Sequence, residues 1–320
     1  MKVCLIKTSS MGDLLHTLPA LTDAQRAIPD LQLDWVAEEN FAEIPQWHSA
    51  VNRVIPMALR RWRKKPFNAQ VRYQWRQYRT LLQANEYDAV IDAQGLLKSA
   101  VFATRLAHGV KHGYDCRSIR EPLAAFFYDK TYNIRYRQHA VERIRQLFAA
   151  GLGYPLPTAK GDYGIAHHFL NQPHFAPPYL IFIHSTTRND KHWPEAAWRE
   201  LIALLEPYGY RIRLPWGNEK ERLRAERLAH GFAYADVLPK TSLSQIANQL
   251  AHAKAVVSVD TGLSHLTAAL DKPNITLYGA SDPMLIGAYG NNQTALTAES
   301  MAEITVRQVI DQLKTTIERV

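Results

Sequence analysis

Short apolar runs alternate with helix-like patterns along the first half of the chain. A polar loop at 8–13 follows the first run, and apolar side chains then recur at helical spacing from Leu14 to Ala24. Short apolar runs separated by helices are typical of a parallel sheet. We therefore predict one α/β layer structure for this half, with strands at 3–6, 33–37, 54–56 and 89–91.

A second series of the same kind begins near residue 179. Its predicted strands are 180–183, 211–214, 256–259 and 275–277, and its predicted helices are 195–205, 219–229, 243–251 and 263–270. Glycine and repeated prolines before this series are typical of a connection between domains. We predict an N-terminal domain at 1–155, a connection at 156–178 and a C-terminal domain at 179–300. In two doubly wound α/β domains, ligands are expected in the cleft at the carboxyl ends of the strands.

Length and cysteine content narrow the class of protein. The chain has 320 residues, more than one hydrophobic core usually organises. Cys4 and Cys116 are its only cysteines, too few for a disulfide framework or a four-thiolate zinc site, which suits a reducing cytoplasm. Only four consecutive apolar residues precede Lys7, and no apolar stretch approaches the roughly 20 residues that span a bilayer. We expect a cytoplasmic protein whose membrane contact is peripheral.

The positive charge of the chain is concentrated in its first half. Residues 1–150 contain 22 Lys and Arg against 14 Asp and Glu, whereas residues 151–320 contain 16 of each, so the formal net charge of +8 belongs to the first part. A positive field favours an acidic partner, such as nucleic acid, anionic lipid or a phosphorylated or carboxylated substrate. The alternative is that the excess only makes one face soluble.

The densest basic run is at 60–65, where Trp62 is a candidate interfacial anchor. Arginine and lysine side chains suit phosphate and carboxylate groups. The run has no recognisable nucleic-acid reader motif, so we expect no nucleic-acid partner. Further basic residues that are expected to join it in space are Lys98, Arg120, Arg143 and Arg145.

The polar segment at 184–194 leaves a predicted strand and enters a predicted helix near Pro194. Neither G-x-G-x-x-G nor G-x-x-x-x-G-K-[ST] occurs, which argues against a dehydrogenase or a P-loop kinase. Thr186, Thr187 and Lys191 could instead donate to phosphate oxygens. The alternative is a capped loop with solvated polar residues.

A second strand-to-helix junction lies at 259–266. The backbone N–H groups at the start of its helix form an anion site. Together with 184–194 it predicts a diphosphate pocket, with Thr261 and Gly262 on phosphate and Asp260 or His265 orienting it. His265 alone is equally compatible with a core or capping role.

Asp13 lies in the corresponding loop of the basic domain, where its carboxylate could accept a proton from an attacking hydroxyl. An Asp in a first helical turn is also favourable simply because it complements the helix dipole. For metal ions, neither H-E-x-x-H nor Asp-x-Asp occurs, and the paired histidines lack carboxylates at ligand spacing. We therefore expect no obligatory metal and no other cofactor.

Four motifs together resemble the lipopolysaccharide heptosyltransferases of glycosyltransferase family 9. They are K-T-S-S-M-G-D at 7–13, D-A-Q-G-L at 92–96, T-T-R-N-D-K-H-W-P at 186–194 and S-V-D-T-G-L-S-H-L at 258–266. Their order and spacing fit over nearly the whole chain. The stretches R-R-W-R-K at 60–64, G-V-K-H-G at 109–113 and L-P-W-G at 214–217 are similar to the members that add the first heptose.

The resemblance implies a GT-B fold, in which two Rossmann-like domains face a central cleft. It implies inverting transfer of L-glycero-D-manno-heptose from ADP-heptose to the first Kdo of Kdo2-lipid A, without a metal, at the cytoplasmic face of the inner membrane. Asp13 then becomes the base, and the carboxylate of Glu221 would bind the adenosine ribose. The donor-binding residues implied are Thr186, Thr187, Lys191, Glu221, Thr241, Asp260, Thr261, Gly262 and His265.

The same resemblance gives the basic residues an acidic partner, the Kdo carboxylates and the lipid A phosphates. It also implies that the last helix, about 301–320, packs back on the N-terminal domain. Two alternatives remain: a core-sugar transferase of the same fold that accepts a heptose, and a non-catalytic binder of acidic glycolipid or nucleic acid. The acceptor-binding residues implied are Arg60, Arg61, Arg63, Lys64, Lys98, Arg120 and Arg143.

Overall fold

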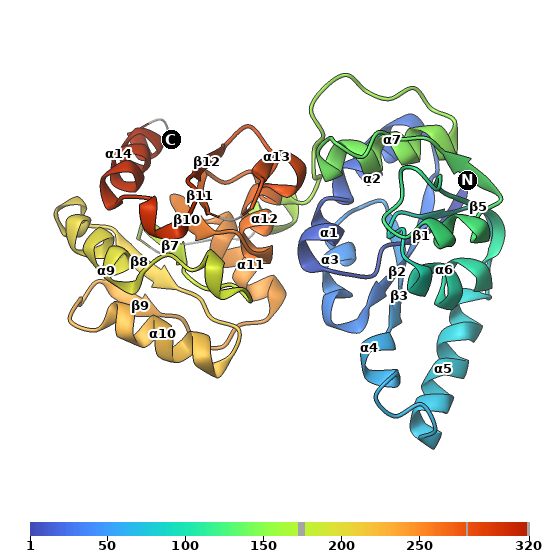
Figure 1. The fold of residues 1–320 in the computed structure, drawn as a ribbon, viewed down its shortest axis with the longest axis horizontal. Coiled ribbons are helices and arrows are strands. Elements are labelled where there is room, and N and C mark those ends of the chain that lie inside the picture. The colour runs from blue at the N-terminus through green and yellow to red at the C-terminus, as the bar shows by residue number, and fades with distance from the viewer. Residues whose placement is uncertain (172–176, 280, 319–320) are drawn as a thin grey trace. The chain divides into compact units, whose positions relative to one another are not determined.

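The computed structural model describes residues 1–171, 177–279 and 281–318. The chain separates into two compact units, Met1–Gly164 and Ile165–Val320, whose elements are labelled in Figure 1. The division falls inside the 156–178 segment, of which 172–176 lie outside the described residues.

Each unit is built on one six-stranded sheet with helices between successive strands (Figure 1). The strands of unit 1 are β1 (Lys2–Ile6), β2 (Gln32–Glu38), β3 (Val51–Met57), β4 (Glu86–Asp92), β5 (His108–Tyr114) and β6 (Lys130–Tyr132). Its helices are α1 (Met11–Leu15), α2 (Leu18–Ala27), α3 (Glu43–Gln46), α4 (Leu59–Trp62), α5 (Ala69–Leu82), α6 (Leu97–Phe102) and α7 (Ala140–Leu152).

Unit 2 repeats this plan. Its strands are β7 (Tyr179–Ile183), β8 (Arg211–Leu214), β9 (Ala235–Val237), β10 (Ala255–Val259), β11 (Asn274–Tyr278) and β12 (Gln293–Thr297). Its helices are α8 (Ala166–Leu170), α9 (Glu195–Leu204), α10 (Glu219–Ala229), α11 (Leu243–Ala251), α12 (Gly262–Ala269), α13 (Pro283–Ile286) and α14 (Val306–Glu318).

The two sheets have the same strand order. Unit 1 runs β3-β2-β1-β4-β5-β6 and unit 2 runs β9-β8-β7-β10-β11-β12, with parallel pairing throughout. In both, the order reverses direction between the first and fourth strands, so β1/β4 and β7/β10 are the topological switch points where such sheets bind ligands. The doubly wound α/β prediction is confirmed for both units.

The predicted N-terminal helix is divided into two. α1 ends at Leu15 and α2 begins at Leu18, with Pro19 in its first turn. Proline has no N–H to donate to the preceding turn, so the apolar pattern from Leu14 to Ala24 continues across a break. The break leaves α1 as a separate turn that holds Asp13 next to the end of β1.

The C-terminal helix belongs to unit 2. α14 packs on α9, β10 and β11, and Val306, Val309, Ile310 and Leu313 are part of the core of that unit. These positions share one helical face, so packing on unit 2 removes the apolar stripe of the helix from water. That the segment 301–320 packs back on the N-terminal domain stays a prediction; residues 319–320 of this segment lie outside the described residues.

Two expectations about unit 1 were wrong. Trp62 is no interfacial anchor: only 7% of it is exposed, and its ring packs against Trp75 and Tyr78. Arg145 does not join the basic surface, because its guanidinium is buried and bonded to the carboxylate of Asp23 at 2.6 Å. Both side chains are buried by tertiary packing, which the local sequence does not reveal.

Candidate functional site

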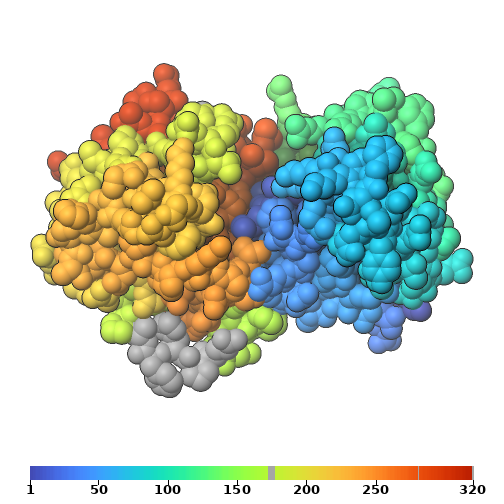
Figure 2. All heavy atoms as spheres, turned by 90° about the horizontal axis from the view of Figure 1, so that it is seen from below, coloured from blue at the N-terminus to red at the C-terminus, as the bar shows by residue number. Residues whose placement is uncertain are grey.

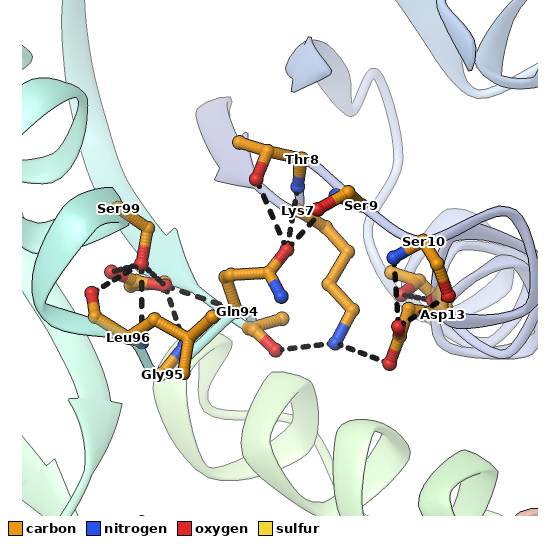
Figure 3. A network of polar contacts seen from close by, with 12 residues as sticks. Lys7, Thr8, Ser9, Ser10, Asp13, Gln94, Gly95, Leu96 and Ser99 are labelled. Atoms are coloured by element: carbon orange, nitrogen blue, oxygen red, sulfur yellow. Dashed lines mark hydrogen bonds and ion pairs between the residues drawn. The ribbon is translucent and has the colours of Figure 1, made fainter. Parts of the chain in front are cut away.

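The first cluster follows β1 at the switch point of unit 1. Ser10 caps α1, and the Asp13 Oδ2 atom accepts hydrogen bonds from the Ser10 amide at 2.8 Å and the Ser10 hydroxyl at 2.9 Å. The Lys7 ammonium is 3.6 Å from Asp13 Oδ1 and donates to the Ala93 carbonyl at 2.9 Å (Figure 3). Asp13 is therefore both a helix cap and a carboxylate held beside a buried cation, with 45% of its side chain exposed.

Gln94 joins this loop to the end of β4. Its Oε1 atom accepts hydrogen bonds from the backbone amides of Thr8 at 2.8 Å and Ser9 at 3.1 Å (Figure 3). β1 and β4 are neighbours in register, with Ile6 opposite Asp92, so the two loops leave the sheet side by side. The motif D-A-Q-G-L was recognised, but no role was predicted for Gln94. Its position just after a buried strand was the available signal.

Asp92, the last residue of β4, holds the loop that contains Gln94 through hydrogen bonds to its carboxylate. It is fully buried, and its carboxylate accepts hydrogen bonds from the amides of Gln94 and Gly95 and from the hydroxyls of Ser99 and Thr104. Burial raises the pKa of Asp92, although these donors act in the opposite direction. Gly95 has φ +65, a left-handed conformation that favours glycine. The loop is thereby fixed by buried polar contacts.

The second cluster lies at the switch point of unit 2, where β7 and β10 are paired. The Lys191 ammonium donates to Asp260 Oδ2 at 2.5 Å, and only 15% and 6% of these two side chains are exposed. The Thr186 hydroxyl donates to the Asp260 carbonyl at 3.1 Å, and its amide donates to His192 Nε2 at 3.2 Å. The 184–194 loop is thus bonded to the residue that follows β10, as expected if the two segments form one diphosphate pocket.

The start of α12 completes this cluster. Thr261 caps the helix, Gly262 is its first residue, and both are partly exposed. The ring of His265 is mostly buried, with Nε2 at 3.8 Å from Asp260 Oδ1. Thr187 is exposed on the facing loop. The sequence-predicted phosphate residues are therefore brought together around Asp260, and the backbone N–H groups at the start of α12 favour an anion.

Glu221 and Thr241 lie farther along the same edge of the sheet. Glu221 follows β8, where its carboxylate accepts hydrogen bonds from the Gly217 amide and the Asn218 side-chain amide, both at 2.7 Å. Thr241 follows β9 and precedes the Ser242 cap of α11. Four neighbouring strands, β10, β7, β8 and β9, therefore present candidate donor residues at their carboxyl ends.

Basic residues gather around the end of β2 in unit 1. Glu38 accepts a hydrogen bond from the Arg60 amide, and Arg61 forms an ion pair with Glu39 at 2.8 Å. Burial raises the pKa of Glu38, while the nearby charges of Arg60 and Lys98 lower it. Arg60, in α4, and Lys98, in α6, therefore both act on this carboxylate. Arg63 and Lys64 follow α4 and are exposed.

Arg120 and Arg143 belong to the region beside α6. The carboxylate of Glu121, which follows Arg120, accepts a hydrogen bond from the Leu97 amide at 2.6 Å. The Arg143 guanidinium donates to the Ser118 carbonyl at 2.7 Å and lies over the rings of Tyr114 and Tyr136. Arg120 is exposed, whereas Arg143 is partly buried and already has partners within unit 1.

His184, at the end of β7, predicts a pH dependence of stability. Burial lowers its pKa from 6.5 to about 3, with the charge of Arg224 as a second cause. Because the unfolded chain binds this proton and the folded chain does not, the free energy of unfolding falls as pH drops from about 6.5 toward 3. Urea titrations near pH 7 and near pH 5 should show a loss that is about 2 kcal/mol smaller in His184→Asn. An equal loss in both proteins would contradict this assignment.

The described residues contain neither a candidate metal centre nor a candidate membrane span. No group of three or more His, Cys, Asp or Glu side chains in that part of the chain is placed to hold a metal ion. No helix within 1–171, 177–279 or 281–318 is long and apolar enough to cross a membrane.

Known proteins resemble the chain in sequence and fold. Residues 75–314 match Glycosyltransferase family 9 (heptosyltransferase). Lipopolysaccharide heptosyltransferase 1 of Escherichia coli strain K12 is 60% identical over 98% of this chain and 99% of its own length.

Two solved structures extend this similarity to three dimensions. The E. coli heptosyltransferase WaaC with ADP has a TM-score of 0.97 and 60% identity, covering 99% of this chain and 100% of its own. The same E. coli enzyme with ADP-2-deoxy-2-fluoro heptose has a TM-score of 0.93 and 59% identity, covering 98% and 99%.

Proposed function

The chain belongs to glycosyltransferase family 9, the heptosyltransferases, and from that premise we propose that it transfers L-glycero-D-manno-heptose from ADP-heptose to the first Kdo of Kdo2-lipid A, with inversion. The fold is of the GT-B type, with a doubly wound sheet in each unit. The observation that carries the proposal is the Thr186, Lys191 and Asp260 cluster at the switch point of unit 2.

The donor is proposed to bind at this cluster through its diphosphate. An ammonium has three N–H donors, and Asp260 takes one from Lys191, so two remain for phosphate oxygens. Thr187, Thr261 and Gly262 add a hydroxyl and the N–H groups of a helix start. Glu221 and Thr241, farther along the same edge, are assigned to the ribose and the adenine. The E. coli structures named above with ADP and with an ADP-heptose analogue support this assignment.

Asp13 is proposed to be the general base. As the Kdo hydroxyl attacks the anomeric carbon, its proton passes to Asp13, the bond from that carbon to the diphosphate oxygen breaks, and ADP leaves from the opposite face. The Lys7 ammonium lies 3.6 Å from the Oδ1 atom of Asp13 and complements the charge of the carboxylate. Lys191 meets the negative charge that develops on ADP, so the proposal includes no metal.

The acceptor and the membrane are proposed partners of unit 1. Exposed Arg63, Lys64 and Arg120 provide cations for the Kdo carboxylates and lipid A phosphates, and Arg143 adds a fixed one. Because the acceptor is a membrane lipid, we propose that the chain binds peripherally at the cytoplasmic face of the inner membrane.

The direct test incubates the purified protein with ADP-heptose and Kdo2-lipid A in the presence of a chelator, and follows ADP release and the mass of the lipid. A gain of one heptose would establish donor, acceptor and metal independence together. If product formed only with an acceptor that already carries a heptose, the acceptor sugar would be a heptose and not Kdo. Product only after a divalent cation is added would overturn metal independence.

Gln94 is predicted to act as a positioning residue. Gln94→Leu removes the oxygen that fixes the amides of Thr8 and Ser9, so Asp13 is less well placed and kcat should fall about tenfold. Gln94→Glu keeps an oxygen at this point and should retain most of the rate. The KM for ADP-heptose should stay unchanged in both, because the donor residues belong to unit 2. Steady-state kinetics of the three proteins would contradict this if the two variants lost equal activity.

A further inference from the structure

One segment carries the net charge of the whole protein. Residues 59–82 contain eight Arg and Lys and no Asp or Glu; the rest of the chain has 30 basic and 30 acidic residues. α4, the turn after it and α5 form this segment, which we call the α4–α5 hairpin. Figure 1 shows α4 and α5 projecting beyond the sheet of their unit. The light-blue atoms of the hairpin form a broad surface in Figure 2.

Most of these cations form no ion pair with a carboxylate among the residues that the structure describes. Arg72, Arg76 and Arg79 are exposed and spaced so that they share one face of α5. Within the described part of the chain, the ion pairs of the hairpin are limited to that of Arg61 with Glu39. The basic residues that form none there are Arg60, Arg63, Lys64, Lys65, Arg72, Arg76 and Arg79.

An apolar cavity opens among these cations. Its volume is about 230 Å³, and its lining is Leu59, Trp62, Arg63, Pro66, Val71, Arg72, Trp75 and Phe102. Six of these eight side chains are apolar, and the two arginines put positive charge beside them. Such a cavity suits a hydrocarbon chain whose headgroup is anionic.

Phe67 stands at the tip of the hairpin. It lies in a turn closed by a hydrogen bond from the Asn68 amide to the Lys65 carbonyl, and Asn68 then caps α5. The turn directs Phe67 outward, and 89% of it is exposed. Exposing a phenylalanine to this degree costs hydrophobic free energy that an apolar partner would recover.

We propose that the α4–α5 hairpin docks on an anionic phospholipid bilayer, with Phe67 inserted and the basic face of α5 on the headgroups. The inference rests on the proposed function, because it names the surface that brings the enzyme to a membrane-embedded acceptor. Charge complementarity supplies the long-range attraction. The apolar tip and cavity can be buried in a bilayer, whereas the phosphates of a nucleic acid would not cover them.

The first test measures flotation of the full chain with vesicles. Vesicles of equal parts phosphatidylglycerol and phosphatidylcholine should bind the protein, and vesicles of phosphatidylcholine alone should not. Phe67→Ser should weaken binding about tenfold. The triple variant with Arg72, Arg76 and Arg79 changed to Gln should weaken it about 100-fold, and added salt should weaken the wild type in the same way.

Matched controls lie on unit 2. Met284→Ser replaces an apolar side chain that is 76% exposed. Changing Lys254, Arg307 and Lys314 to Gln removes three positive charges, as many as the triple variant of α5 removes. Both should bind the anionic vesicles like the wild type. If the control triple variant lost as much vesicle binding as the α5 triple variant, binding would depend only on net charge, and the proposed docking surface would be overturned. Wild-type binding by Phe67→Ser would overturn insertion, and binding to an oligonucleotide but not to vesicles would replace the bilayer with nucleic acid.

A second test separates docking from catalysis. With a deacylated, water-soluble acceptor, Phe67→Ser should transfer heptose at the wild-type rate; with Kdo2-lipid A in anionic vesicles, its rate should fall about tenfold at limiting lipid. Equal rates with both acceptors would overturn the docking role. If the wild type transfers no heptose to either acceptor, the proposed function fails while the vesicle-binding result still decides the docking surface.

Discussion

Replacing Asp13 by asparagine is expected to lower the rate of heptosyl transfer by at least about 100-fold, the range for loss of a general base. Asparagine has nearly the same shape, and its side-chain oxygen can still accept the hydrogen bonds that Ser10 donates to Asp13. ADP affinity should stay within about twofold, because the proposed donor cluster belongs to unit 2. The measurements are single-turnover transfer and ADP titration calorimetry.

A second variant separates the two roles of Asp13. Asp13→Ala loses the cap of α1 as well as the base, so it should be about 1 kcal/mol less stable than Asp13→Asn. If transfer depends on the base, both variants lose the rate to a similar extent despite this difference. A fast Asp13→Asn with a slow Asp13→Ala would mean that the carboxylate acts only as a cap.

The central part of each sheet could be predicted because its strands are buried on both faces. The runs at 3–6, 180–183 and 256–259 are almost wholly apolar, as expected for central parallel strands, and they lie within β1, β7 and β10. The outer strands give a weaker signal. β6 is Lys-Thr-Tyr and β12 is Gln-Thr-Ala-Leu-Thr, short segments that alternate or lack apolar residues. Neither was predicted.

The candidate site was predictable where a residue follows a readable strand. Asp260 and Lys191 flank the switch point that the apolar runs reveal, and the structure joins them directly. Gln94 was missed because its role depends on the register between β1 and β4, which brings it to the amides of Thr8 and Ser9. No local pattern encodes that pairing.

Surface assignments depend on tertiary partners in the same way. Trp62 stands in a basic run and looks exposed in the sequence, yet Trp75 and Tyr78 bury it. Phe67 follows the same run and is exposed, because a tight turn places it at the tip of the hairpin. The apolar face of α14 is buried in the core of unit 2, a partner that the pattern of residues 301–320 alone does not reveal.

Replacing Lys191 by methionine is expected to lower kcat by about 100-fold to 1,000-fold, the effect of removing one donor from a charge-stabilising site. ADP affinity should fall as well, because Lys191 is proposed to contact the diphosphate before and after transfer. Methionine keeps the length of the side chain but removes the charge. The measurements are steady-state kinetics and ADP titration calorimetry.

The same change has a cost in stability. The carboxylate of Asp260 is 6% exposed and lies 2.5 Å from the ammonium that the variant removes. Breaking a buried pair from one side leaves a charge without its partner, so Lys191→Met should lose about 3 kcal/mol of unfolding free energy. Asp260→Asn in the same chain removes that charge and should restore most of the loss.

The double variant therefore separates catalysis from folding. If Lys191 acts on the diphosphate, Lys191→Met/Asp260→Asn regains stability in urea titrations but remains as slow as Lys191→Met, because neither methionine nor asparagine supplies a cation. If Lys191 serves only to neutralise Asp260, the double variant regains both stability and rate. Unfolding free energy and kcat are both measured for the wild type, for each single variant, Lys191→Met and Asp260→Asn, and for the double variant. Recovery of both quantities in the double variant would remove Lys191 from the donor site.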